Sequence, residues 1–185
     1  MSLLRFTVFT ALVLTVSYSS FQVHAANDRH DQSLGPASPF AIALETLQKQ
    51  IGYTFKSIGL LRRAMTHSSF SQENNRALSI LGANVIETSV SLHFLFKNIE
   101  ISSKDLNRRI SEISNVDSSC AIDGMRLGLH KVIRVSPKTN SSIPAVVCGG
   151  FRAIFGAIAL DTQKSDDAGD VFWRVHSVRE LIHSE

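Results

Sequence analysis

Several motifs that mark common enzyme classes are missing from this sequence. It has no G-x-S-x-G elbow, no H-E-x-x-H or C-x-x-C motif and no glycine-rich phosphate-binding loop. Its histidines are widely spaced, and strand-like alternation is confined to Lys131–Val135. The familiar motifs of serine hydrolases, zinc hydrolases, dithiol enzymes and nucleotide-binding proteins are therefore excluded, and no cofactor is expected.

The chain also lacks long hydrophobic runs and a strong charge of one sign. Its apolar run Phe6–Val16 has eleven residues, whereas a bilayer span takes about 20. No later segment is expected to approach that length, so the mature chain is expected to have no membrane span. The net charge is +3, and adjacent basic residues occur only at Arg62-Arg63 and Arg108-Arg109. Since a nucleic-acid binder usually carries a denser basic stripe, the charge permits an acidic partner without requiring one.

The N-terminal segment has the pattern of a secretory signal. Arg5 precedes the apolar run, and Val23-His24-Ala25 has small residues at the positions that a signal peptidase reads. Residues 1–25 are therefore predicted to be a cleaved signal peptide, which places the protein in the secretory pathway, in the endoplasmic reticulum lumen or outside the cell. A retained membrane anchor is one alternative. A mitochondrial transit peptide is the other, since such peptides have few acids and no acid occurs before Asp28. Residues 26–40 are polar, contain Gly and Pro, and are predicted to be a linker.

Two features are typical of an oxidising compartment. Asn140-Ser141-Ser142 is a glycosylation sequon in a polar stretch. Cys120 and Cys148 are the only cysteines, and in the secretory lumen they can form a disulfide. The alternative is that both are buried free thiols, which is common for cysteine, and the sequence leaves the two open.

Apolar residues recur at three- and four-residue spacings over most of residues 41–185, the period of an α-helix. Capping residues and glycines mark several helix ends. The pattern predicts one all-α domain with six or seven helices. The expected helices are 39–50, 60–66, 76–97, about 103–115, 116–127, 147–158 and 171–182, the last after an acidic loop at 165–170.

Three stretches together resemble the ribonuclease III domain. Ile51–Ser69 is similar to the family's G-Y-x-F turn followed by L-L-x-x-A-x-T-H-x-S. Asn75–Val85 (NRALSILGANV) stands where the signature N-E-R-L-E-F-L-G-D-A-V is expected, and Val146–Asp161 resembles I-L-A-D-A-F-E-A-I-I-G-A-I-Y-L-D. Leu127-Gly128-Leu129 matches the family's internal L-G-L. The resemblance implies a ribonuclease III-like helical fold for the domain.

The same resemblance implies where a metal site would lie. In the family, a Glu and an Asp four residues apart, and an Asp and a Glu three apart on the facing helix, hold Mg²⁺ for phosphodiester cleavage. This chain has Ser79, Ala83, Gly149 and Arg152 at those positions, and Arg76 replaces a further signature Glu. All four carboxylates are missing, and Arg152 places a fixed positive charge where the cation would sit. A degenerate nuclease domain without metal is therefore predicted.

A non-catalytic interaction or scaffold role is the first functional hypothesis. Leu44–Asn75 resembles a plant group of short, signal-bearing ribonuclease III-like proteins, which implies a role in fusion of the polar nuclei (karyogamy) in the female gametophyte. Ribonuclease III domains dimerise through the signature helix, so a homodimer or another protein partner is expected. Candidate interface residues are Leu78, Ile80, Leu81 and Val85; the alternative is that they serve only the domain's own core.

Two other functions stay open. The second hypothesis is a double-stranded RNA-binding module that does not cleave. It requires that the following arginines share one surface: Arg62, Arg63, Arg76, Arg108, Arg109 and Arg152. Residual metal-dependent ribonuclease activity in RNA processing is the third hypothesis. It requires replacement carboxylates, and the acids near the site positions, Glu73, Glu87 and the 165–170 segment, are better explained as solvated side chains.

Overall fold

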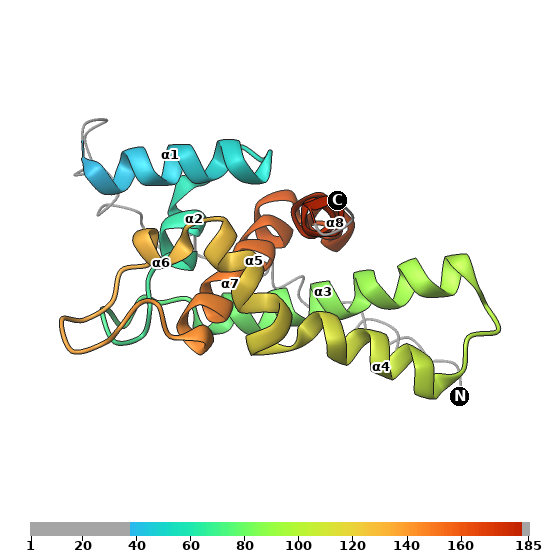
Figure 1. Cartoon of the computed structure of the whole chain (residues 1–185). Coiled ribbons are helices and arrows are strands. Elements are labelled where there is room, and N and C mark those ends of the chain that lie inside the picture. The colour runs from blue at the N-terminus through green and yellow to red at the C-terminus, as the bar shows by residue number, and fades with distance from the viewer. Residues whose placement is uncertain (1–37, 183–185) are drawn as a thin grey trace, which may run out of the picture. The chain divides into compact units, whose positions relative to one another are not determined.

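The structure is a computed structural model that describes residues 38–182, with side chains through Ser177. The predicted signal peptide, and all of the predicted linker before residue 38, lie outside the described residues. The described part is helical and contains no strand, which confirms the all-α prediction (Figure 1). Its elements are α1 (Pro39–Ile51), α2 (Ile58–Ala64), α3 (Arg76–Lys97), α4 (Ser103–Ser114), a π-helix η2 (Val116–Cys120), α5 (Ala121–Arg126), α6 (Leu129–Val132), α7 (Pro144–Thr162) and α8 (Ser165–Ile182).

Local sequence signals explain several helix ends. The Ser38 hydroxyl accepts a hydrogen bond from the Ala41 amide at 3.1 Å, and Pro39 occupies the first turn of α1. Gly52 ends α1 with φ of 65°, a left-handed conformation that favours glycine. The Ser102 hydroxyl caps α4 in the same way, through the Asp105 amide. The predicted bounds of α3 agree with the structure.

Two predicted segments differ in the structure. The acidic segment 165–170 is the first part of α8 and not a loop, because Asp166 and Asp167 are favoured in a helix's first turn by the positive end of its dipole. The segment Lys131–Val135 ends the short helix α6 and makes only an isolated parallel bridge between Thr66 and Arg134. Period-two alternation over so few residues does not separate a strand from such a connection.

Helix α7 is the centre of the described domain. Eleven of its residues are buried, and α2, α3, α5 and α8 all pack against it. Both α7 and α3 are long and apolar enough to cross a membrane by length and composition, so the expectation that no later segment approaches that length is wrong. A core helix passes the same test, because burial inside a protein also selects apolar residues.

The helices α3 and α7 approach closely at two glycines. A Cβ atom on Gly82 would overlap the carbonyl oxygen of Arg152, and one on Gly156 would overlap the carbonyl oxygen of Leu78. Only glycine permits this backbone-to-backbone contact. The crossing therefore fixes which turns of α3 face which turns of α7.

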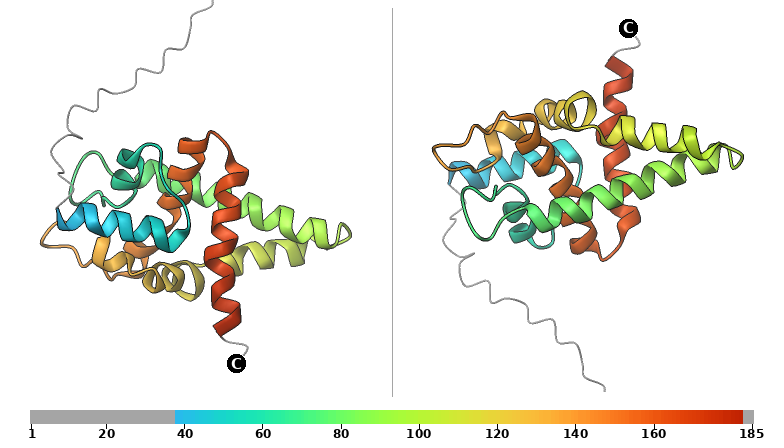
Figure 2. Two further views of the ribbon diagram at one scale, coloured as in Figure 1. Left: turned by 90° about the horizontal axis from the view of Figure 1, so that it is seen from above. Right: turned by 90° about the horizontal axis from the view of Figure 1, so that it is seen from below.

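The paired helices α3 and α4 extend away from the other helices (Figure 2). Helix α4 has no buried residue, and Phe96 near the end of α3 is 85% exposed. The first half of α3 belongs to the core, whereas its second half is covered only in part.

Asp161, the last residue of the G-A-I-x-L-D motif, joins two distant motifs. Its carboxylate accepts hydrogen bonds from the Tyr53 hydroxyl at 2.7 Å and from the amides of Lys56 and Ser57, both at 2.8 Å. Burial alone would raise the pKa of Asp161, but these hydrogen bonds and the Lys56 charge hold the pKa below its ordinary value. The motif's Asp therefore has a structural role here, since it connects the end of α7 to the start of α2.

The glycine crossing generates a stability prediction. We expect Gly82→Ala to lower the free energy of unfolding by about 1–3 kcal/mol or more, because the new methyl group has no space against α7. Gly149→Ala is the matched control: it also adds a methyl to a helical glycine, but nothing lies within 4 Å of that Cβ. The control is expected to be neutral or more stable by about 0.5–1 kcal/mol. Urea unfolding followed by circular dichroism checks both, and equal midpoints for the two variants would contradict the packing argument.

Candidate functional site

The four positions that correspond to metal ligands lie on the two helices that cross. Ser79 and Ala83 are one turn apart on α3, and Gly149 and Arg152 are one turn apart on α7. Ala83 and Arg152 line the same small cavity, whose volume is about 10 Å³. That volume is at the lower limit for a single water molecule. One position from each pair, Ala83 and Arg152, therefore lies beside this cavity, and the space there is almost filled.

The Arg152 side chain binds within the domain. Its Nη2 donates a hydrogen bond of 2.6 Å to the carbonyl oxygen of Ser114, the last residue of α4. The last carbonyls of a helix lack partners inside the helix and carry the negative end of its dipole, so a cation stabilises them. At a position where the family has a metal-binding carboxylate, this chain thus has a cation that caps α4.

A disulfide lies beside the same site. Cys120, at the end of η2, is bonded to Cys148 on α7, the residue immediately before Gly149. The two Cα atoms are 5.1 Å apart, and both residues are buried. This bond and the Arg152 hydrogen bond attach the segment between α4 and α5 to α7 at two neighbouring points.

The residues at this site do not fit a magnesium ion. Mg²⁺ prefers several oxygen ligands, usually carboxylates and water, and the four positions offer a single hydroxyl, that of Ser79. Glu73 and Glu87 are exposed side chains elsewhere on the α3 region, and Asp166, Asp167 and Asp170 are exposed on α8. Within residues 38–177, no group of three or more His, Cys, Asp or Glu side chains is arranged to hold a metal ion.

Comparison with known proteins agrees with this geometry. A family model described as Ribonuclease-III-like matches residues 57–173. The chain belongs to the ribonuclease-III-like family. It is 58% identical over 184 residues to the Arabidopsis thaliana protein named Protein NUCLEAR FUSION DEFECTIVE 2, covering 97% of this chain and 96% of that protein.

Bacterial members are more distant. The chain is 30% identical over 123 residues to Ribonuclease 3 of Campylobacter fetus, covering 64% of this chain and 55% of that protein; it thus spans about half the length of that enzyme. Its fold matches the nuclease domain of ribonuclease III from Campylobacter jejuni with a TM-score of 0.67 at 28% identity, over 71% of this chain and 94% of that domain. That structure is described as showing flexibility in a region involved in dimer formation.

The predicted interface residues of the family's signature helix divide into two groups. Leu78 and Val85 are 4% and 5% exposed and belong to the domain's own core, which is the alternative considered for these residues. Their positions on the helix face α7, as does that of Gly82. Ile80 points the other way and is 67% exposed, and Leu81 is half-buried between the two groups.

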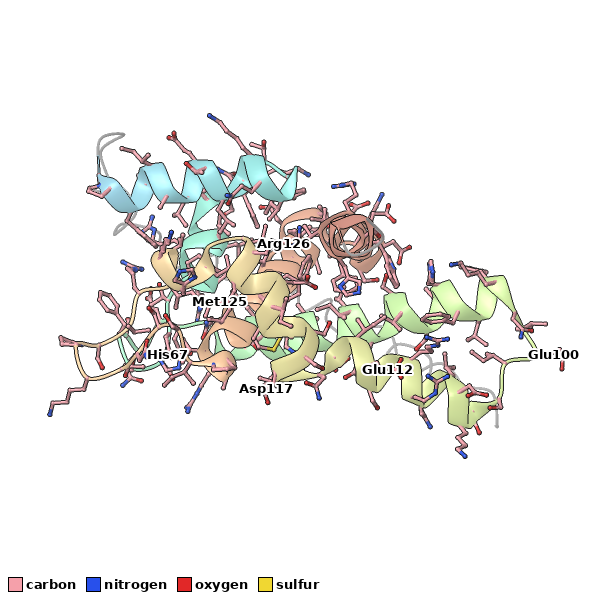
Figure 3. All side chains as sticks on the ribbon, in the orientation of Figure 1. His67, Glu100, Glu112, Asp117, Met125 and Arg126 are labelled. Carbon is pink, nitrogen blue, oxygen red and sulfur yellow. A yellow bond between two sulfur atoms is a disulfide. The ribbon has the colours of Figure 1, made fainter. Side chains whose placement is uncertain are left out.

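The arginines proposed to hold phosphates do not form one surface. Arg108 and Arg109 lie on α4 and form ion pairs with Glu112 at 2.9 and 3.7 Å, while Arg152 is bound to Ser114. Figure 3 shows Glu100 and Glu112 far from His67, near which Arg62, Arg63 and Arg76 lie in sequence. Of the six arginines, only Arg62, Arg63 and Arg76 belong to the α2–α3 end of the domain.

Sequence reasoning missed two polar clusters. The guanidinium of Arg134 lies over the Phe40 and Phe70 rings, with 4.3 and 4.9 Å from its central carbon to the ring centroids. Asp123 and His176 form a buried pair with 2.6 Å between carboxylate oxygen and Nδ1, which joins α5 to α8. No motif in the sequence marks either cluster, because each joins residues far apart along the chain.

The disulfide generates the second stability prediction. We expect the Cys120→Ala/Cys148→Ala double variant to lose about 3–4 kcal/mol of unfolding free energy, because the bond closes a loop between residues 28 positions apart. Urea unfolding of oxidised protein, reduced protein and the double variant measures this loss. The reduced protein and the double variant should have similar midpoints well below that of the oxidised protein. An oxidised protein no more stable than these two would contradict the prediction.

Proposed function

We propose that this protein is a non-catalytic interaction module that takes part in nuclear fusion. The observation that carries the proposal is the state of the metal-ligand positions: they have no carboxylate, and Arg152 is bound to the last residue of α4. The helix crossing that positions the two pairs is retained. Such a domain keeps the surfaces of the family without the donor set for cleavage.

Loss of cleavage follows from the chemistry of the reaction. Hydrolysis of a phosphodiester by this family relies on Mg²⁺ to activate water and to neutralise charge on the leaving oxygen. Arg152 does not replace that function, because its Nη2 is already bound to Ser114 and the cavity beside it holds no more than a water molecule.

The link to nuclear fusion rests on similarity along almost the whole chain. The Arabidopsis relative named NUCLEAR FUSION DEFECTIVE 2 matches at 58% identity from end to end. We infer that the two proteins share their role, which the resemblance of Leu44–Asn75 connects with fusion of the polar nuclei.

Self-association is the proposed mode of action. Ile80 is a large apolar side chain that is two-thirds exposed on α3, one residue after the position of the lost Glu, Ser79. An exposed apolar residue on a rigid helix is suited to an interface. The related Campylobacter jejuni domain has a region involved in dimer formation, which supports a homodimer through this face of α3.

We further propose that the protein works in the secretory pathway, after removal of residues 1–25. The disulfide fits an oxidising compartment. Asn140 is exposed in a turn, where its side-chain oxygen accepts the Ser142 amide at 2.9 Å, so a glycan has free access to it. Protein purified from plant tissue should begin at Ala26 and lose mass on treatment with an N-glycosidase, and Asn140→Gln should remove that loss. An unglycosylated protein that retains residues 1–25 would contradict the assignment.

Binding of duplex RNA without cleavage is the second candidate. It is favoured by the arginines of the α2–α3 end, which are Arg62, Arg63 and Arg76. Of these, only Arg76 lies near the degenerate metal positions in the sequence. Purified residues 26–185 mixed with labelled duplex RNA, with and without Mg²⁺, separate the candidates: no cutting is expected, and Mg²⁺-dependent cutting would refute the proposed function.

The interface is tested with a charge on α3. We expect Ile80→Lys to raise the dissociation constant of the dimer by about 30-fold or more, since a buried interface anchor contributes at least about 2 kcal/mol. Sedimentation velocity at micromolar concentration measures it. Phe96→Lys is the control, because Phe96 is still more exposed but lies more than four turns away on α3. A wild-type protein that sediments as a monomer, or a dimer that both variants leave intact, would count against this interface.

A further inference from the structure

Basic side chains gather at the end of the domain that carries the T-H-x-S motif. Two segments, residues 62–76 and 130–138, contain six Lys and Arg residues and a single acid, Glu73. The six are Arg62, Arg63, Arg76, Lys131, Arg134 and Lys138. This imbalance contrasts with the chain as a whole, where 19 basic residues meet 16 acids.

Backbone contacts hold the two segments side by side (Figure 1). The His67 amide donates to the Arg134 carbonyl at 2.9 Å, and the Arg134 amide donates to the Met65 carbonyl at 2.9 Å. Farther along, the Ser136 amide donates to the Ser69 hydroxyl at 3.1 Å. The two segments therefore lie against each other at residues 65–69 and 134–136, and we call their combined surface the basic face.

Arg134 is the most constrained cation of the basic face. Besides its two aromatic contacts, its Nη2 donates a hydrogen bond of 2.6 Å to the Thr66 hydroxyl, which itself donates to the Arg62 carbonyl. Its Nε is buried and has no hydrogen-bond partner among the described residues. Burial and then the nearby Arg62 cation lower the pKa of Arg134, and burial and then Arg76 lower the pKa of His67. Positive groups thus crowd together here at an electrostatic cost.

Three arginines elsewhere in the described domain have carboxylate partners, whereas Arg152 and Arg174 bind backbone carbonyls. Arg108 and Arg109 pair with Glu112, and Arg126 pairs with Asp123. Among residues 38–177, no ion pair is formed by Arg63, Arg76 or Arg134. In Figure 3, His67 of the basic face lies toward one end of the view and Glu100 at the other. For Arg63, Arg76 and Arg134, no ion pair with an acid of residues 38–177 offsets the repulsion between neighbouring cations.

We propose that the basic face is a binding site for a phosphate-type oxyanion, held by Arg134 and Arg76. An anion would supply the negative charge that the surrounding residues lack. The ring contacts and the Thr66 hydrogen bond fix the Arg134 guanidinium in advance, so little side-chain entropy is lost when it binds. Guanidinium groups hold phosphate through strong, charge-assisted hydrogen bonds.

The site takes Arg134 from outside α3, whereas Arg76 lies three and four residues before Ser79 and Ile80 on that helix. Titration with an oxyanion measures anion binding directly and does not depend on dimer formation. The same oxyanion chemistry is presented by free phosphate, by a phospholipid headgroup and by the backbone of RNA. A phosphate ion or headgroup fits better than duplex RNA, because the proposed glycan on Asn140 lies in the loop that follows Lys138 and would obstruct a long rigid strand.

Inorganic pyrophosphate is the first probe. It is titrated into ¹⁵N-labelled protein, comprising residues 26–185, while the amide and arginine Nε–H resonances are followed by NMR. We expect saturable shifts at His67 and at the Nε–H of Arg134 in the millimolar range or below. Arg134→Gln and Arg76→Gln should each weaken binding about tenfold, the loss of one charge-assisted hydrogen bond. Arg108→Gln, which removes a paired arginine from α4, should leave it unchanged.

Arg76 is exposed, and its side chain forms no ion pair among residues 38–177. Its variant is therefore expected to fold and keeps the test valid if Arg134→Gln does not fold. The absence of saturable shifts, or shifts that both variants leave unaltered, would overturn the site. Vesicles with and without an anionic phospholipid, and duplex RNA, identify the source of the oxyanion. Binding to the anionic vesicles or to duplex RNA supports the site if Arg76→Gln weakens it. Binding to RNA alone would in addition favour the RNA-binding candidate as the function.

Discussion

The contact of α3 with α7 through Gly82 and Gly156 is the constraint on which the rest of the domain depends. Because neither glycine has room for a Cβ atom, the two backbones meet directly and only one register is compatible with the packing. That register puts Leu78 and Val85 into the core, leaves Ile80 outside, and places Ala83 opposite Arg152. The core, the proposed interface and the positions that correspond to the family's metal ligands are thus all arranged by one helix crossing.

A domain that loses its metal carboxylates must still hold the same helices together. In this chain the Arg152 cation binds the end of α4, and the Cys120–Cys148 disulfide fastens η2 to α7 one residue before a lost ligand. Removing four carboxylates also removes their mutual repulsion, which in a metal enzyme only the cation offsets. We infer that the degenerate site contributes stability where its catalytic relatives bind a charged cofactor. The proposed interaction role follows, because the surfaces persist after the chemistry is lost.

Several helix bounds and caps could be predicted from the sequence, whereas contacts between residues far apart along the chain could not. The bounds of α3 and the cap at Ser38 follow from periodicity and capping chemistry, which are local. Which apolar residues of α3 face a partner could not be read from their type, since Leu78 and Ile80 differ only in the direction set by the α7 contact. Arg134 was missed because its partners, Phe40, Thr66 and Phe70, are assembled by the fold and not by spacing along the chain.

The central claim is that protein groups, and not a metal, occupy the position of the family's catalytic centre. Titration of Mn²⁺ into ¹⁵N-labelled, oxidised protein tests it most directly, since a bound paramagnetic ion broadens nearby amide resonances. Our account predicts no saturable broadening centred on Ser79, Ala83, Gly149 and Arg152, because these residues lack the oxygen donors that such ions require. Saturable loss of those four resonances before others would show a metal site and contradict the account.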